Sequence, residues 1–141
     1  MKNFPRWLRE FTYRGDIHKA LVVRDADRKD LAQLRAQMHA KIANRTYPFA
    51  VKIAIIVQEL EAWLLADHEA ISVVTGRQTA RLPDPIEGID SPKQRLRVIL
   101  STARLAYTAP LAGRIAAEAN TRRLAERCPA FRTFCQNAAD C

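Results

Sequence analysis

Apolar residues form two short runs in the first half of the chain, 20–23 and 53–57, and spaced patterns elsewhere. The runs predict buried β-strands over residues 19–24 and 51–57. Between them, Leu31, Leu34 and Met38 recur at the spacing of a helix with one apolar face. This order predicts two parallel strands joined by a right-handed crossover helix.

Helical patterns occupy most of the remaining sequence. Residues 5–11 predict a short helix, and a longer one is predicted from about Glu59 to Val74. After a proline-rich connection, a further apolar stripe is formed by Leu96, Ile99, Leu100, Ala103 and Tyr107. The predicted fold class is therefore α/β, with a small parallel sheet, crossover helices and a helical C-terminal part.

The length of 141 residues favours a single domain over residues 1–141. Within it we expect a sheet portion at 18–75, a proline-rich loop at 76–92 and a helical portion at 93–141. No apolar run reaches the roughly 18 residues that a membrane span requires, and no secretory leader is evident, so we expect a cytoplasmic protein. The three cysteines lack the spacing of a zinc site and are expected to be reduced thiols.

Charge adds a weak indication of a polyanionic partner. The net charge is +8, and two basic regions flank an acidic central region at 59–92. A basic body around an acidic centre suits a metal site that acts on nucleic acid. The same distribution also occurs in ordinary soluble proteins with arginine-rich helices.

Two acidic pairs follow the two predicted strands. Asp25 and Asp27 end the first strand in a D-x-D pattern, which directs both carboxylates to the same side of the backbone. Glu59 and Glu61 follow the second strand. Because parallel strands end at the same edge of a sheet, Asp25, Asp27 and Glu59 should lie close together there, and carboxylates in this position suit a hard cation such as Mg²⁺ or Mn²⁺.

Each of these residues also has a purely structural interpretation. Aspartates after a strand often form turns or cap helices, which is an alternative role for Asp25 and Asp27. Glu61 can serve as an acidic partner of a helix N-terminus. Lys93 follows Pro92 at the start of the helical portion and is a candidate phosphate contact, although a solvated lysine needs no function.

Four short motifs along the chain resemble those of a known family. They are Asp25-Ala26-Asp27, the segment from Gln58 to Asp67, Ser91-Pro92-Lys93 and Cys128-Pro129-Ala130-Phe131. Together they resemble an uncharacterised bacterial domain family of unknown function that is TOPRIM-like and often encoded beside AAA-type (OLD-like) ATPases in phage-defence clusters. The resemblance implies a TOPRIM-like sheet in which Asp25 and Asp27 bind the metal, while Glu59 or Glu61 is a further ligand or general base in phosphodiester chemistry.

The N-terminal region departs from this family pattern. TOPRIM-like domains normally begin with an extra strand that ends in a glutamate, and no such unit precedes Asp25 here. Glu10, inside a helix-like stretch, is a poor substitute. The chain therefore looks shortened, which puts nuclease activity in doubt and is expected to expose a sheet edge that favours a homodimer.

Three hypotheses follow from these observations. The first is a Mg²⁺-dependent nuclease-like domain that acts on nucleic acid. The second is a non-catalytic subunit that docks on an ATPase, with acids that are only structural. The third is nucleic-acid binding through the basic helices without any metal requirement.

Overall fold

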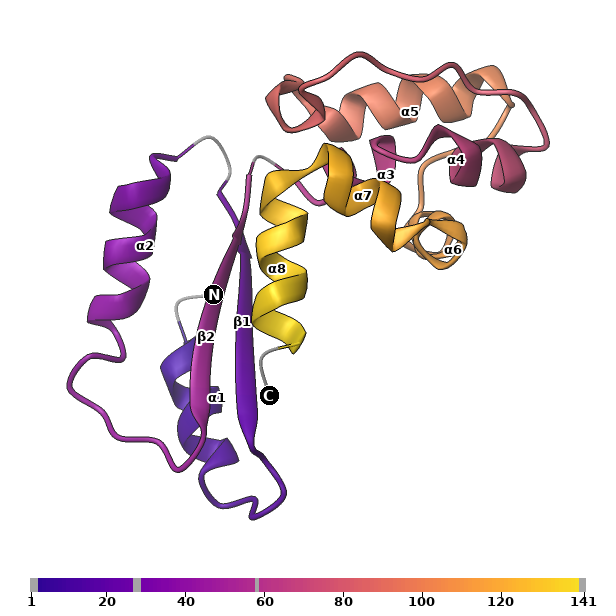
Figure 1. Cartoon of the computed structure of the whole chain (residues 1–141). Helices are drawn as coiled ribbons and strands as arrows, with labels where there is room; N and C mark the ends of the chain where they lie inside the picture. The colour runs from indigo at the N-terminus through magenta and orange to yellow at the C-terminus, as the bar shows by residue number, and fades with distance from the viewer. Residues whose placement is uncertain (1–2, 27–28, 58, 140–141) are drawn as a thin grey trace.

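The computed structural model describes residues 3–26, 29–57 and 59–139 (Figure 1). Its sheet consists of β1 (Lys19–Asp25) and β2 (Ala50–Ile56), which run parallel and are joined through α2 (Leu31–Ala40). The register pairs Lys19 with Ala50 and Asp25 with Ile56. The predicted strand–helix–strand unit is thus confirmed, with strand bounds that differ by about one residue.

Helix α2 begins where the sequence places a capping aspartate. The Asp30 side chain accepts a hydrogen bond from the Gln33 backbone N–H at 2.7 Å. This bond satisfies one of the amide groups that a helix leaves without partners in its first turn. Asp30 therefore fixes the point at which the chain turns from the end of β1 into the crossover.

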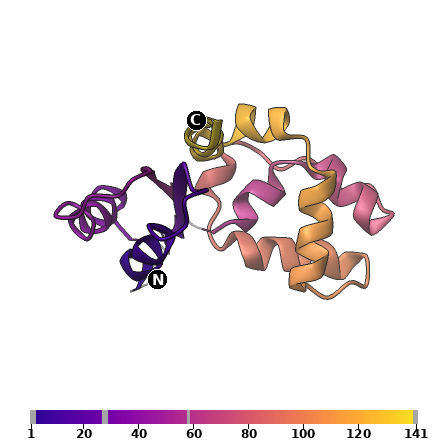
Figure 2. The same cartoon turned by 90° about the horizontal axis from the view of Figure 1, so that it is seen from below.

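The two faces of the sheet are covered by different helices. Helices α1 (Phe4–Phe11) and α2 pack on one face, and α8 (Pro129–Ala139) packs on the other (Figure 1). In the view from below, the sheet lies between the α1–α2 pair and the helical part of the chain (Figure 2). The chain thus returns from its C-terminal portion to complete the layer that begins near its N-terminus.

Five further helices form the helical part between β2 and α8. They are α3 (Glu61–Leu65), α4 (His68–Thr75), α5 (Pro92–Thr102), α6 (Ala109–Glu118) and α7 (Thr121–Arg127), with a 3₁₀ turn η1 (Ile86–Gly88) before α5. Their apolar side chains share one core, which includes Leu96, Leu100 and Ile115, each without measurable exposure. The predicted helical C-terminal part is confirmed.

The single helix expected from Glu59 to Val74 is wrong, because the chain breaks it at Ala66–Asp67. The backbone of Asp67 is not helical, and its side chain caps α4, accepting hydrogen bonds from the backbone N–H groups of Glu69 and Ala70 at 3.1 and 3.3 Å. A second correction concerns Tyr107, which lies beyond the end of α5 and does not belong to its stripe. The residue instead reaches α3, as described below.

A buried arginine fastens the proline-rich connection to α7. The Arg127 guanidinium donates to the carbonyl oxygens of Ala66 and Leu82 at 2.6 and 2.5 Å and to Asp84 Oδ1 at 3.0 Å. Its side chain is only 6% exposed. The long connection is therefore held against the helices by a charged group that makes three hydrogen bonds.

The thiol of Cys128 lies in the helical core. The residue has no exposed surface, whereas Cys135 is half-buried. Burial, with a further contribution from the nearby Glu87 charge, raises the pKa of Cys128 to about 12. The group accordingly behaves as a small apolar side chain.

None of the helices in the described ranges is long and apolar enough to cross a membrane.

Candidate functional site

The carboxyl-terminal edge of the sheet brings the two strand ends together. Asp25 closes β1 directly opposite Ile56, the last residue of β2, and the Ala26 N–H donates to the Ile56 carbonyl at 2.9 Å. Glu59 is the third residue after the end of β2, and Glu61 is the first residue of α3. Asp27, the second predicted metal ligand, lies outside the described residues.

Glu59 reaches the first turn of α5. Its Oε2 atom accepts a hydrogen bond from the Lys93 backbone N–H at 2.8 Å. Lys93 is the second residue of α5, so its amide is one of those that the helix leaves unsatisfied, and Ser91 at the N-cap position makes no side-chain cap. Glu59 therefore caps α5 from a distant segment and places a negative charge at the positive end of its dipole.

Glu61 is a buried acid with two partners. Its side chain is 10% exposed, and its Oε1 atom accepts a hydrogen bond from the Tyr107 hydroxyl at 2.5 Å. The Lys93 ammonium lies 3.5 Å from the same oxygen. Together these contacts compensate the carboxylate for lost hydration.

Tyr107 keeps its proton over a wide pH range. Burial is the main cause that raises its pKa to about 12, followed by the hydrogen bond and negative charge of Glu61, while the Arg97 charge acts in the opposite direction. The phenol is thus a hydrogen-bond donor to Glu61 at neutral pH. It orients the carboxylate and does not compete with it for a proton.

Two cations lie against the Tyr107 ring. Lys93 Nζ is 5.2 Å from the ring centroid, and Arg97 Cζ is 5.7 Å from it. Both distances fall within the range of cation–π attraction. Lys93 thus contacts Glu59 through its backbone and Glu61 and Tyr107 through its side chain, and this single residue joins the two acids.

The structure therefore brings together three of the five predicted site residues, Glu59, Glu61 and Lys93. Sequence reasoning missed Arg97, although it lies one helical turn after Lys93 and that spacing was available. It also assigned Tyr107 to an apolar stripe. No local pattern identifies Tyr107, because its partner Glu61 is 46 residues away in the sequence.

The described acids do not by themselves form a metal-binding group. Within the residues whose positions are described, no group of three histidine, cysteine, aspartate or glutamate side chains is close enough to hold a metal ion. Glu59 Oε1 and Glu61 Oε2 accept no hydrogen bond from the same residues, so each carboxylate retains an oxygen of the type that Mg²⁺ prefers. A ligand set built on Asp25 requires Asp27 in addition.

Another part of the 58–67 motif has structural roles. Trp63 packs its ring edge-on against Phe131 with centroids 4.9 Å apart, and its Nε1–H donates to Glu87 Oε1 at 3.3 Å. Glu87 also accepts the Ala130 backbone N–H at 3.1 Å, which caps α8. The 58–67 and 128–131 motifs therefore meet through one indole ring and one carboxylate.

Asp67 is the most heavily bonded acid of this region. Besides capping α4, it accepts the Asn120 backbone N–H at 2.9 Å and a hydrogen bond from Arg123, which also pairs with Glu69 at 2.7 Å. Burial acts to raise the pKa of Asp67, but the hydrogen bonds from Asn120, Arg123 and Ala70 outweigh it, and the pKa lies below its usual value. Asp67 is therefore a buried, ionised anchor between α4 and α7.

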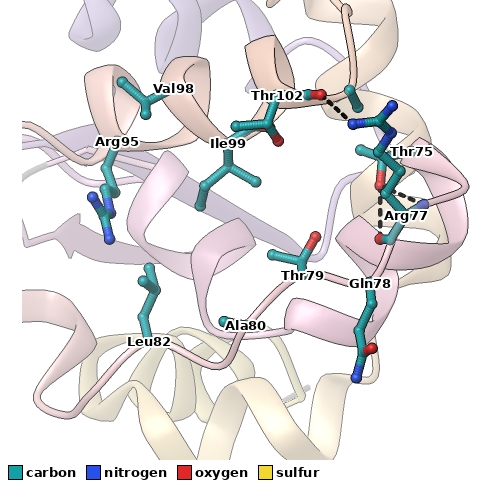
Figure 3. Close-up of a pocket in the computed structure, with 11 residues that line it drawn as sticks. Thr75, Arg77, Gln78, Thr79, Ala80, Leu82, Arg95, Val98, Ile99 and Thr102 are labelled. Carbon is teal, nitrogen blue, oxygen red and sulfur yellow. Dashed lines mark hydrogen bonds between the residues drawn. The ribbon is translucent and has the colours of Figure 1, made fainter.

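A separate cavity of about 370 Å³ lies between the other side of α5 and the segment after α4 (Figure 3). Arg95, Val98 and Ile99 line it from α5, and Thr79 and Leu82 line it from the facing segment. The glutamates of the candidate site do not contribute to its lining. The cavity is therefore distinct from the acidic site at the sheet edge.

The comparison with known families decides the classification. A sequence model described as "Domain of unknown function (DUF4276)" matches residues 8–137. The chain belongs to this family. No curated protein and no solved structure matches it significantly.

Membership in DUF4276 confirms the expectation of an uncharacterised domain family. The match spans all four motifs and both halves of the fold, from α1 to α8. The TOPRIM relation, the metal and the partners of this DUF4276 chain are matters for proposal.

Proposed function

We propose that this DUF4276 chain is a TOPRIM-related, metal-dependent domain that processes phosphodiester bonds of nucleic acid in a defence-type system. The observation that carries the proposal is the position of Lys93, which is bonded to both Glu59 and Glu61 beyond the carboxyl ends of two parallel strands. Ligand sites of open α/β sheets form at this edge. Acids and a cation side by side suit a charged substrate that arrives with a counter-ion.

The proposal gives each residue a role. Asp25 and Asp27 would hold Mg²⁺ or Mn²⁺, with Glu59 or Glu61 as a further ligand or general base. When bound, the metal stabilises developing negative charge and lowers the pKa of an attacking water. Lys93, with a side chain that is 42% exposed, would contact a substrate phosphate while its contact with Glu61 positions the ammonium.

A second candidate function is a non-catalytic subunit that docks on an AAA-type ATPase. The observation that favours it is that both glutamates make contacts that stabilise the fold. Glu59 caps α5, and Glu61 accepts a hydrogen bond from Tyr107. On this hypothesis the acids stabilise the helical part, and Asp25 ends a strand without binding a metal.

A calorimetric Mn²⁺ titration separates the two candidates. The parent chain would be compared with Asp25→Ala/Asp27→Ala and with Asp16→Ala/Glu118→Ala, a control that removes two exposed acids elsewhere. The metal-dependent proposal expects binding by the parent and the control, and loss of binding in the first variant. Equal behaviour of all three chains contradicts it and favours the docking subunit.

Cleavage and binding assays on labelled single- and double-stranded DNA and RNA then test the chemistry. We expect Mg²⁺- or Mn²⁺-dependent cleavage that Lys93→Ala weakens and Glu61→Gln abolishes. Binding that needs no metal, falls steeply with salt and leads to no cleavage would instead support nucleic-acid binding through the basic helices.

A further inference from the structure

The hydrogen-bond register of the sheet identifies which peptide groups of β2 lack a strand neighbour. In the described part of the chain the sheet order is β1–β2, so β2 pairs along one edge only. At one end of the ladder the Ala50 N–H donates to the His18 carbonyl at 3.3 Å, and at the other end Ile56 accepts from Ala26. Ala50 and Ile56 therefore both face β1.

Peptide groups along a strand point alternately to its two edges. Because Ala50 and Ile56 face β1, so do Lys52 and Ala54, which lie between them at even spacing. The N–H and C=O groups of the intervening residues point away from β1, and these residues are Val51, Ile53 and Ile55. None of these three residues has a hydrogen-bond partner for its backbone elsewhere in the described chain.

A narrow groove of about 100 Å³ runs along this outer edge. Its floor is formed by residues 53–55 and 57 of the strand region, and no residue of β1 lines it. Leu31 and Arg35 of α2 form one wall, and a single face of α8 forms the other, through Ala130, Thr133, Phe134 and Asn137. Helices α2 and α8 lie on opposite faces of the sheet (Figure 1). The groove between them therefore lies beside β2, where a third strand would pair.

The unpaired edge has an energetic cost. Ile53 and Ile55 expose only 7% and 9% of their surface, so water has limited access to their peptide groups. Backbone groups in such positions normally have partners, and leaving one unsatisfied destabilises the fold. An added strand would satisfy them through main-chain hydrogen bonds.

We propose that the occupant of this edge is a second copy of the same chain, which pairs its own β2 antiparallel to the first. A twofold axis through Ile53 would place the two Ile53 residues opposite each other and Val51 opposite Ile55. In such pairs both residues exchange N–H···O=C bonds, and their β-branched side chains pack on one face. The outward residues of β2 are thus complementary to themselves.

The walls of the groove agree with this occupant. Across the axis α2 would lie beside α2 and α8 beside α8, so that Leu31, which is 40% exposed, becomes covered. The described lining contains a single charged residue, Arg35, so self-pairing brings few like charges together locally. The net charge of +8 on each copy still opposes association, and added salt should therefore strengthen the dimer.

Sedimentation equilibrium over a range of protein concentrations, at low and high salt, tests the proposal. We expect a monomer–dimer equilibrium that shifts toward dimer in high salt. Leu31→Lys/Thr133→Lys places a cation on each wall and should weaken dimerisation about tenfold or more. The matched control Val73→Lys/Thr121→Lys adds the same charges at exposed positions away from the groove and should shift the equilibrium much less.

Amide hydrogen exchange followed by NMR gives a second readout that does not depend on a substitution. The amides of Lys52 and Ala54 should be protected at every concentration, because they donate to β1. Those of Val51, Ile53 and Ile55 should become protected only as dimer forms. A chain that remains monomeric, a dimer that resists the wall variant as well as the control, or exchange at these three amides that ignores concentration would each overturn the proposal.

Discussion

The two cores of this molecule differ in how they treat polar groups. On the α1–α2 face of the sheet the buried residues are all apolar, among them Leu8, Leu34 and Met38. In the helical half, two acids are buried as well, Glu61 and Asp67. Both lie within seven residues of each other in the 58–67 motif.

The two halves therefore hold their acidic residues in different ways. The sheet half sets where the strands end and so positions Asp25, through a ladder of backbone bonds that any apolar sequence can form. The helical half holds its acids through specific long-range partners, since Asp67 is bonded to Arg123 and Glu61 to Tyr107. Changes at these partners should therefore damage the helical half selectively.

The largest expected effect is that of Asp67→Ala. The variant removes the cap of α4 and leaves the Asn120 N–H without its buried acceptor, so the free energy of unfolding should fall by about 2–4 kcal/mol. Urea denaturation measures this loss. The control Glu69→Ala removes the other partner of Arg123, which is 63% exposed, and should cost about 1 kcal/mol or less. Equal effects of the two variants would show that burial of the pair is unimportant.

The pH dependence of stability provides an independent check on Asp67. Its pKa in the folded chain is lower than in the unfolded chain, so ionised Asp67 stabilises the fold fully above the unfolded pKa of about 4. That contribution is lost as the pH falls through the folded value. Urea denaturation of the parent and of Asp67→Asn at a series of pH values measures this contribution. The difference between their free energies of unfolding should be constant near neutral pH and shrink below about pH 4. A difference that persists unchanged in acid would contradict the low pKa.

The sequence was sufficient to predict the βαβ unit, because two apolar runs around an amphipathic helix have few other solutions. For the same reason it placed Glu59 at the carboxyl edge of the sheet, but it did not predict the contact with Lys93, which lies 34 residues further along the chain. It did not predict the break at Asp67, because the groups that favour it, on Asn120 and Arg123, are 53 and 56 residues away. The residues between Glu59 and Val74 have a continuous helical pattern, and the distant donors add to the local bonds from Glu69 and Ala70 that Asp67 makes as the cap of α4.

A smaller effect is expected for Tyr107→Phe, which removes one hydrogen bond from a buried carboxylate. The loss should be about 1–3 kcal/mol, because Glu61 keeps the Lys93 ammonium as a partner. In an ultraviolet titration the parent should show a tyrosine that ionises near pH 12, raised chiefly by burial, and the variant should lack it. The raised pKa also means that Tyr107 stabilises the fold below pH 10 and that this advantage disappears as the pH rises through 12. Three tyrosines that all titrate near pH 10 would contradict the contact with Glu61.

The smallest expected effect belongs to Glu59, and it is also the most informative about function. Glu59→Ala removes the cap on α5 and should lower stability by about 1 kcal/mol, whereas Glu59→Gln retains an oxygen that can accept the Lys93 N–H and should cost less. If Glu59 is only a cap, any activity or metal binding of the parent should survive in Glu59→Gln. If Glu59 is also a metal ligand or base, Glu59→Gln should lose that activity while its urea midpoint stays close to that of the parent. Because the two roles use different oxygens of one carboxylate, this pair of variants separates the contribution of Glu59 to the fold from its contribution to chemistry.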